Sequence, residues 1–195
     1  MRPSARFAGA PAQVRIIGGS WKRTPLPVAS APGLRPSPDR VRETAFNWIA
    51  HLVPELSAVR GLDLFAGTGA LGFELASRGA SEVVLVERNA ALAAQLERTR
   101  QKLAAGGVRI VVGDALAIVR TFLERSFEIV FLDPPFDSDL LGPAIDAAAR
   151  LVTDTGLVYV ESGAPLPADA PMPCGLRVIR ASRAGQVHFH LLQRA

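Results

Sequence analysis

The chain has 195 residues, of which 49% are hydrophobic and 21% charged, and its formal net charge is +4. This composition is typical of a folded protein with one main core and excludes a largely disordered chain. The single cysteine, Cys174, excludes an intramolecular disulfide and a cysteine-based zinc site, and with only three scattered histidines we expect no bound metal.

Apolar runs in this sequence are too short to span a bilayer, and the first residues lack the apolar core of a signal peptide. We therefore expect a cytoplasmic protein without a membrane partner. The charge is uneven: residues 1–60 carry a net +6, residues 61–169 a net −6 and residues 170–195 a net +4. Basic ends around an acidic middle favour a polyanionic partner such as nucleic acid, although an unevenly charged solvated surface explains the same pattern.

The N-terminal third divides into a flexible tail, residues 1–13, and a basic extension, residues 14–58. Within the extension, residues 14–28 read as two short strands that turn at Gly18-Gly19. Ser37 is predicted to be the N-cap of a helix whose first residue is Pro38. Apolar residues then recur at helical spacing, at Val41, Ala45, Trp48 and Leu52.

The remaining residues, 59–195, alternate strands and helices. The expected strands are 61–65, 82–87, 108–112, 127–133 and 156–161, and the expected helices are about 70–78, 89–104, 115–124 and 138–151. Strands 175–181 and 186–192 form a hairpin across residues 183–185. This rhythm predicts an α/β fold with a doubly wound, mostly parallel seven-stranded sheet, closed by a C-terminal antiparallel hairpin.

A glycine-rich loop follows the first strand of this core, in Asp63-Leu-Phe-Ala-Gly67-Thr-Gly69-Ala-Leu-Gly72. Such glycines allow the backbone to approach a nucleotide, and Glu87, at the end of the next strand, can accept both ribose hydroxyls. The pattern alone does not distinguish NAD, FAD and S-adenosylmethionine. A purely structural tight turn is the alternative.

Two carboxylates favour S-adenosylmethionine. Asp63 suits a cationic ligand with a sulfonium and an ammonium group better than it suits a pyrophosphate. Asp114, after the third core strand, can bind the adenine amino group, and it can equally be the N-cap of the following helix.

The fourth core strand ends in Asp133-Pro134-Pro135-Phe136. Successive prolines fix the backbone, so the Asp133 carboxylate and the Pro134 carbonyl can act as paired acceptors for an exocyclic amino group. Two such acceptors help the amine release its delocalised lone pair, and Phe136 can stack on an extruded base. A strand-ending turn with one exposed aromatic residue is the plain alternative.

Other polar residues carry no assigned role. His188 and His190 alternate with apolar residues and are expected to share the polar face of the last strand. Glu161 ends the fifth core strand, where it lies either near the ligand or in solvent.

Together these motifs resemble class I S-adenosylmethionine-dependent methyltransferases that act on exocyclic amines. The N-terminal segments Arg15-Ile-Ile-Gly-Gly, Leu34-Arg-Pro-Ser-Pro-Asp-Arg-Val-Arg-Glu43 and Phe46-Asn-Trp48 add a more specific resemblance, to the bacterial 16S ribosomal RNA guanine-N2 methyltransferase family known as RsmD. It extends from about Arg15 to the last strand. Phe136 stands where this family often has Tyr, and Ser37 where it often has Thr.

The resemblance implies methyl transfer from S-adenosylmethionine to guanine N2 of 16S ribosomal RNA, by a monomer acting on an assembling or assembled small subunit. The expected catalytic residues are Asp133, Pro134, Pro135 and Phe136. The expected cofactor-binding residues are Asp63, Phe65, Ala66, Gly67, Gly69, Glu87, Arg88, Asp114, Ala115 and Asp133. The expected RNA contacts are Trp21, Lys22, Arg23, Arg35, Arg40, Arg42, Asn47 and Arg183, although Trp21 can instead cover the hairpin.

Three other functions remain open at this point. A DNA adenine-N6 methyltransferase uses the same Asp-Pro-Pro-Phe chemistry, but the chain is short for a separate target-recognition domain. An NAD-dependent oxidoreductase explains the glycine loop and leaves Asp133–Phe136 unexplained. A non-catalytic RNA-binding factor with a nucleotide pocket would bind RNA with a strong dependence on salt and transfer no methyl group.

Overall fold

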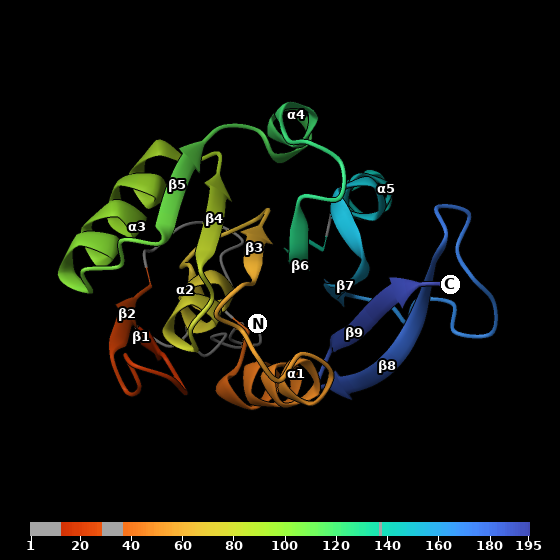
Figure 1. Ribbon diagram of the computed structural model, residues 1–195, viewed down its shortest axis with the longest axis horizontal. Coiled ribbons are helices and arrows are strands. Elements are labelled where there is room, and N and C mark those ends of the chain that lie inside the picture. Colours follow the sequence, from red (N-terminus) through yellow and green to blue (C-terminus); the bar gives the residue numbers. More distant parts are fainter. Residues whose placement is uncertain (1–12, 29–36, 137) are drawn as a thin grey trace, which may run out of the picture.

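A twisted seven-stranded sheet forms the centre of the computed structural model, which describes residues 13–28, 37–136 and 138–195 (Figure 1). The strand order is β5-β4-β3-β6-β7-β9-β8. Strand β9 pairs antiparallel with both β7 and β8, and every other pair in the sheet is parallel. This confirms the predicted fold class. The strands are β3 (Arg60–Asp63), β4 (Glu82–Glu87), β5 (Val108–Val112), β6 (Phe127–Leu132), β7 (Val152–Ser162), β8 (Leu176–Ala184) and β9 (Val187–Arg194).

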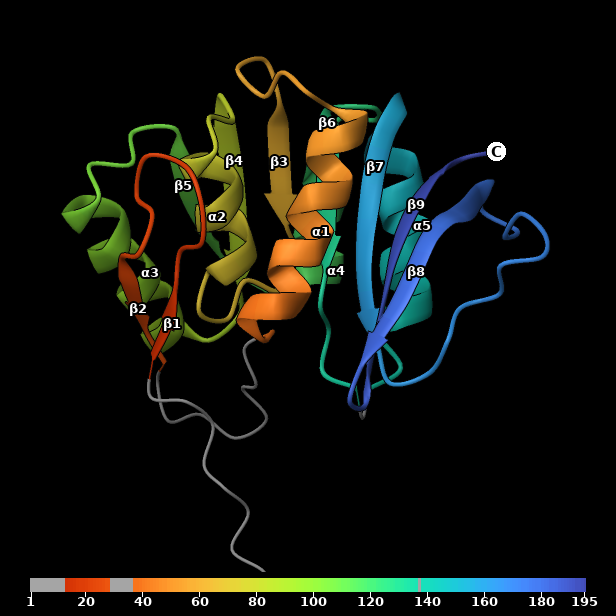
Figure 2. The same cartoon turned by 90° about the horizontal axis from the view of Figure 1, so that it is seen from below.

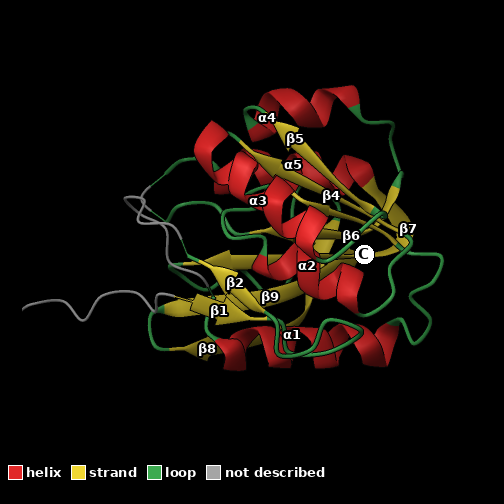
Figure 3. Ribbon diagram, turned by 90° about the vertical axis from the view of Figure 1, so that its left-hand side faces the viewer, coloured by secondary structure: helices red, strands yellow, loops and turns green. Residues whose placement is uncertain are grey.

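Helices cover both faces of the sheet, because its central strands are apolar on both sides. Val83, Val84, Leu85 and Val86 of β4 are all at most 1% exposed. One face packs against α1 (Asp39–Leu52), α2 (Ala70–Ser77) and α3 (Ala90–Lys102), and the other against α4 (Ala115–Ile118) and α5 (Leu141–Leu151). Figure 3 shows the sheet between α1 on one side and α4 and α5 on the other.

The chain changes direction across the sheet between β3 and β6. From β3 it adds β4 and β5 on one side, and after α4 it crosses back to add β6 and β7 on the other. Ligands of doubly wound sheets bind beyond the carboxyl ends of the strands at this kind of switch point. Asp63 is the last residue of β3 and Asp133 directly follows β6, so both lie at this edge.

The N-terminal extension packs into the same core as the sheet. Strands β1 (Gln13–Arg15) and β2 (Pro25–Pro27) pair antiparallel, and Ile16 and Leu26 are fully buried with residues of α2. The turn between them lies on the carboxyl end of α2, where Ser77 Oγ donates to the Gly18 carbonyl at 2.6 Å. Gly19 has φ +77°, and a Cβ there would meet the Ser77 carbonyl oxygen, so this close approach requires glycine.

Two buried charges hold this contact together. Glu74 of α2 accepts the backbone N–H of Ile17 at 2.6 Å and of Gly18 at 2.8 Å. Arg42 of α1 is completely buried, and its Nη1 lies 3.7 Å from Glu74. The same guanidinium donates to the Arg15 carbonyl at 2.8 Å. The pair therefore joins the hairpin, α1 and α2.

Several element boundaries differ from the sequence-based expectation. Ser37 is not a helix cap: α1 begins at Asp39, Pro38 is its N-cap residue, and the Ser37 hydroxyl is used elsewhere. The helix expected over 115–124 ends at Ile118 and continues as a short 3₁₀ turn, Val119–Thr121. Strand β7 begins four residues early because it follows α5 without a loop, so its first residues extend beyond the apolar run that predicted it.

Among the described residues, no helix combines the length and the apolar character that crossing a membrane requires.

Glu74→Ala is expected to lower the free energy of unfolding by about 3–5 kcal/mol, because it removes the acceptor of two backbone N–H groups and a carboxylate that pairs with both Arg42 and Arg78, and it leaves the buried Arg42 with Asp39 as its remaining ion-pair partner. Urea unfolding followed by circular dichroism measures the loss. Glu97→Ala is the control, since it removes a carboxylate on the surface of α3 that pairs with Arg100. We expect the control to unfold at the wild-type midpoint, and similar losses in both variants would show that Glu74 does not anchor the extension.

Candidate active site

The glycine loop between β3 and α2 has the conformation that its sequence requires. Gly67 and Gly69 have φ values of +53° and +76°, which other residues rarely adopt. The Gly67 N–H donates to Glu87 Oε2 at 2.9 Å, and the other Glu87 oxygen accepts the Asn89 N–H at 2.8 Å. Glu87 therefore joins the loops after β3 and β4. Each of its oxygens keeps a lone pair that can accept a hydrogen bond from a ligand hydroxyl.

Asp63 is buried beneath this loop. Its Oδ2 accepts the Gly72 N–H at 3.1 Å, whereas Oδ1 is buried and has no hydrogen-bond partner among the described residues. Burial, together with the charges of Glu87 and Glu161, raises the pKa of Asp63 to about 7. A buried acceptor of this kind fits the ammonium group of a cationic ligand, which would supply both the missing hydrogen bond and the missing charge.

Asp133 to Phe136 form a fixed turn at the carboxyl end of β6. Ser138 donates to the Pro135 carbonyl through both its N–H, at 3.2 Å, and its hydroxyl, at 2.6 Å. Pro134 is buried, while the Phe136 side chain is 47% exposed. An aromatic ring presented to solvent beside a partly exposed carboxyl group is suited to bind a flat, amine-bearing base.

Glu161 belongs to the same cluster, which resolves the two alternatives that its sequence position left open. It ends the apolar part of β7, the strand next to β6, and is only 2% exposed. Its Oε1 accepts hydrogen bonds from the Ser37 hydroxyl at 2.5 Å and from the Tyr159 hydroxyl at 2.9 Å. Ser37 Oγ also lies 3.5 Å from Asp133 Oδ2. The predicted order of strands could have placed Glu161 in this cluster, because the carboxyl ends of β6 and β7 meet at one edge of the sheet.

The other expected cofactor residues lie on the loops at this edge. Asp114 is exposed and accepts the Ala117 N–H at 3.0 Å, which confirms it as a helix N-cap and leaves its second oxygen for a ligand. The Ala66 N–H donates to the Val86 carbonyl at 3.0 Å, which fixes the loop after β3. Arg88 is exposed after β4, Phe65 is partly buried and Ala115 is buried.

The expected RNA contacts do not form one group. Arg42 is wrong as a surface contact, because it is completely buried in the pair with Glu74. Trp21, Lys22 and Arg23 lie in the hairpin turn against the carboxyl end of α2, and Figure 2 shows this turn at the end of the molecule opposite the arrowheads of β3 and β7. Trp21 is partly buried against the core, which agrees with the covering role.

Arg40, Asn47 and Arg183 are exposed. Arg40 lies in the first turn of α1, two residues after Pro38, and Arg183 lies near the carboxyl end of β8, so both are on the side of Asp133. Arg35 is outside the described residues.

His188 and His190 share one face of β9, as expected, but His190 is buried there. His190 is 2% exposed, and its Nε2 accepts the Leu166 N–H at 3.2 Å, so it ties the loop before β8 to the sheet. His188 is partly buried, with its ring stacked 6.5 Å from that of His190. Within residues 13–28, 37–136 and 138–195, no group of three or more His, Cys, Asp and Glu side chains is placed to hold a metal ion.

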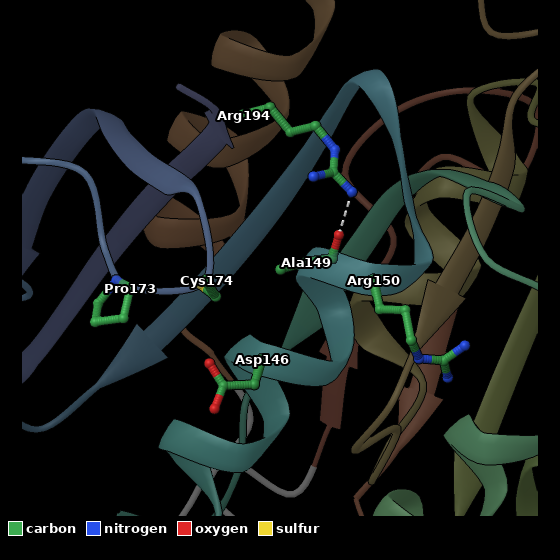
Figure 4. A pocket seen from close by; sticks show the side chains of 6 residues that line it. All are labelled: Asp146, Ala149, Arg150, Pro173, Cys174 and Arg194. Carbon is green, nitrogen blue, oxygen red and sulfur yellow. Dashed lines mark hydrogen bonds between the residues drawn. The ribbon is translucent and has the colours of Figure 1, made fainter.

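A hollow of about 470 Å³ lies away from this site, between α5 and the segment that leads into β8. Figure 4 shows its lining, in which Arg194 donates to the Ala149 carbonyl. None of the residues expected to bind cofactor or substrate lines this hollow, so it does not define the active site.

Several known proteins resemble this chain over nearly its whole length. A family model described as conserved hypothetical protein 95 matches residues 14–193. Ribosomal RNA small subunit methyltransferase D of Escherichia coli K12 is 41% identical, over 93% of this chain and 90% of its own length. The Haemophilus influenzae protein of the same name is 36% identical, over 93% and 94%. Among solved structures, E. coli yhhF superposes with a TM-score of 0.79 at 41% identity, over 93% of this chain and 98% of yhhF.

Asp63→Asn is expected to stabilise the protein more at pH 8 than at pH 5. An unfolded aspartate loses its proton near pH 4, whereas folded Asp63 keeps it until about pH 7. The stability that this proton confers is therefore fully present below about pH 4 and is lost as the pH rises to about 7. Thermal unfolding of both proteins between pH 5 and pH 8 measures the effect, and a difference that does not change with pH would contradict it.

Proposed function

This chain belongs to the RsmD family of bacterial ribosomal RNA small subunit methyltransferases, and on that basis we propose that it transfers a methyl group from S-adenosylmethionine to the exocyclic N2 of a guanine in 16S ribosomal RNA. The substrate is the RNA of an assembling or assembled small subunit, and the enzyme acts as a monomer. The observation that carries the proposal is the placement of Asp133 beside Asp63 across the switch point of the sheet, since β3 and β6 are neighbours. Such a placement brings an amine-binding turn next to a cation-binding loop.

The cofactor side is formed by the loops after β3, β4 and β5. When bound, S-adenosylmethionine supplies an electrophilic methyl group on a cationic sulfonium and leaves as S-adenosylhomocysteine. The Asp63 Oδ1, which has no partner among the described residues, would accept a hydrogen bond from the cofactor's ammonium group, Glu87 would accept from its ribose hydroxyls, and Asp114 would accept from its adenine amino group.

The amine side is formed by Asp133, Pro134 and Phe136. The Asp133 carboxylate and the Pro134 carbonyl accept the two N–H bonds of the guanine amino group, which favours a pyramidal nitrogen with a free lone pair. Phe136 stacks on the guanine ring and fixes its plane. These contacts strengthen as the nitrogen gains positive charge, so the residues act by position and hydrogen bonding, without a covalent enzyme intermediate.

The RNA is held by basic residues on the same side of the molecule as Asp133, among them Arg40 and Arg183. We further propose that the basic extension, residues 14–58, serves the methyltransferase core, residues 59–195, by shaping this side and positioning RNA.

The decisive experiment incubates the purified protein with methyl-labelled S-adenosylmethionine and small ribosomal subunits from cells that lack the enzyme, followed by digestion of the RNA to nucleosides. The proposal requires label in N2-methylguanosine. Label in another nucleoside, or labelling of DNA adenine instead of RNA, would overturn the assigned substrate.

Asp133→Ala and Asp63→Asn are expected to separate chemistry from cofactor binding. Asp133→Ala should lower the single-turnover rate of methyl transfer by about 10²–10³-fold, with the dissociation constant of S-adenosylmethionine nearly unchanged. Asp63→Asn should weaken S-adenosylmethionine binding by about tenfold, because the negative charge that strengthens the hydrogen bond to the ammonium group is lost. Isothermal titration and rapid-quench kinetics measure both, and equal loss of binding in the two variants would refute this division of roles.

Arg40→Ala and Arg183→Ala are each expected to weaken RNA binding uniformly and to reduce the salt dependence of the binding constant by about one counterion. Lys22→Ala and Arg23→Ala are the matched controls, since they remove equal charge from the opposite end of the molecule. Filter binding at several salt concentrations distinguishes the two pairs. Stronger effects at Lys22 and Arg23 would place the RNA on the hairpin turn instead.

A further inference from the structure

Two carboxyl groups at the active-site edge are bridged by one hydroxyl. Asp133 follows β6 and Glu161 lies near the end of the neighbouring strand β7. Ser37 Oγ lies 2.5 Å from Glu161 Oε1 and 3.5 Å from Asp133 Oδ2. A serine hydroxyl has one proton to donate and can accept another, so Ser37 can accept from a protonated Asp133 while it donates to an ionised Glu161.

The surroundings of the two acids are unequal. Glu161 accepts from Ser37 and Tyr159, and the buried guanidinium of Arg42 also favours its ionised form. Asp133, by contrast, has only the long contact to Ser37 among the side chains of the described residues. Burial and then the charge of Glu161 raise the pKa of Asp133 well above its ordinary value, and burial raises the pKa of Glu161 as well.

The other charged groups near the pair come from neighbouring elements. Asp63 lies on β3, Arg42 on α1 and Tyr159 on β7 itself. From β9, the residue that pairs with Glu161 is Phe189, so His188 and His190 lie at alternate positions on the other face of the sheet. The balance of charge at the pair is therefore set by two further groups, the carboxyl group of Asp63 and the guanidinium of Arg42.

We propose that Asp133 and Glu161 form a carboxyl pair that holds one proton across Ser37, and that Glu161 thereby controls whether Asp133 meets the target amine as an acid or as a carboxylate. The inference rests on the proposed function. Glu161 is a positioning residue, since it acts through Asp133. Two carboxyl groups that share one site cannot both ionise readily, and their protons belong to the pair.

The carboxyl pair then accounts for both protons that move during the reaction. The shared proton leaves before methyl transfer, so that Asp133 can accept hydrogen bonds from the amine as a carboxylate. As the nitrogen–carbon bond forms and the sulfur–carbon bond breaks, its electron pair goes to sulfur and the methylated nitrogen carries one surplus proton. That proton passes to Asp133 and restores the pair, so each turnover releases one proton to solvent.

The pH profile of single-turnover methyl transfer tests this inference, because a merely structural role for Glu161 would not shift it in a defined direction. Glu161→Gln keeps the shape of the side chain and removes its charge, so the acidic limb of the profile should move down by about one pH unit. Ser37→Ala removes the hydrogen bond that protonated Asp133 donates to Ser37, so the limb should also move down. Ser37→Thr keeps the hydroxyl and should leave the limb in place.

Asp146→Asn is the control, because it removes one exposed carboxylate from α5 on the other face of the sheet. Its profile should match the wild type. An unshifted limb in Glu161→Gln, with wild-type behaviour in both serine variants, would overturn the inference.

Proton release on S-adenosylmethionine binding supplies a readout that does not depend on methyl transfer. Titration calorimetry in two buffers of different ionisation enthalpy counts the protons, and we expect Glu161→Gln to release fewer than the wild type. Equal proton counts would also overturn the inference, and this measurement decides the matter if Glu161→Gln is inactive. A wild-type protein that binds no S-adenosylmethionine or methylates no RNA would instead refute the proposed function.

Discussion

Three carboxyl groups, of which Asp63 and Glu161 are buried and Asp133 is partly exposed, lie at the ends of three neighbouring strands, and the rest of the site depends on their proximity. Asp63 is the last residue of β3, Asp133 directly follows β6 and Glu161 is the last but one residue of β7, and these three strands are adjacent in the sheet. Ionising all three together in a region with little water costs free energy, so some of them retain protons or a cation must compensate them. The pKa values of all three are raised for this reason. An edge of this kind favours the binding of a positively charged ligand, and its carboxyl groups lower the free energy of unfolding of the unliganded protein.

The N-terminal extension contributes to this edge through buried polar contacts. The carboxylate of Glu74 accepts hydrogen bonds from backbone N–H groups of the hairpin, and Arg42 donates to the carbonyl oxygens of both Arg15 and Ser37. Since Ser37 contacts Glu161, the same guanidinium that fixes the hairpin also fixes the hydroxyl at the active-site edge. The extension is therefore part of the site as well as part of the core.

This arrangement also divides the positive charge of the extension between two ends of the molecule. Lys22 and Arg23 lie near the amino ends of the strands, where α2 ends, whereas Arg40 lies in the first turn of α1 close to Ser37. Arg42, two residues after Arg40, is buried and forms structural contacts. Net charge alone counts all four alike, because it contains no information on which side chains reach the surface.

The sequence by itself determined the fold class and the strand-end positions of Asp63, Glu87 and Asp133, and it offered the capping role of Asp114 as one of two alternatives. These follow from local patterns: apolar strands of fixed length, glycines that need positive φ, and a short polar residue before a helix. Only the tertiary structure decided the roles of Ser37, Arg42 and Glu161. Ser37 reads locally as a helix cap and Arg42 as a surface charge, yet their partners lie 124 residues away in the chain for Ser37 and 32 for Arg42. Contacts over such separations depend on strand order and helix docking, and these are properties of the folded chain as a whole.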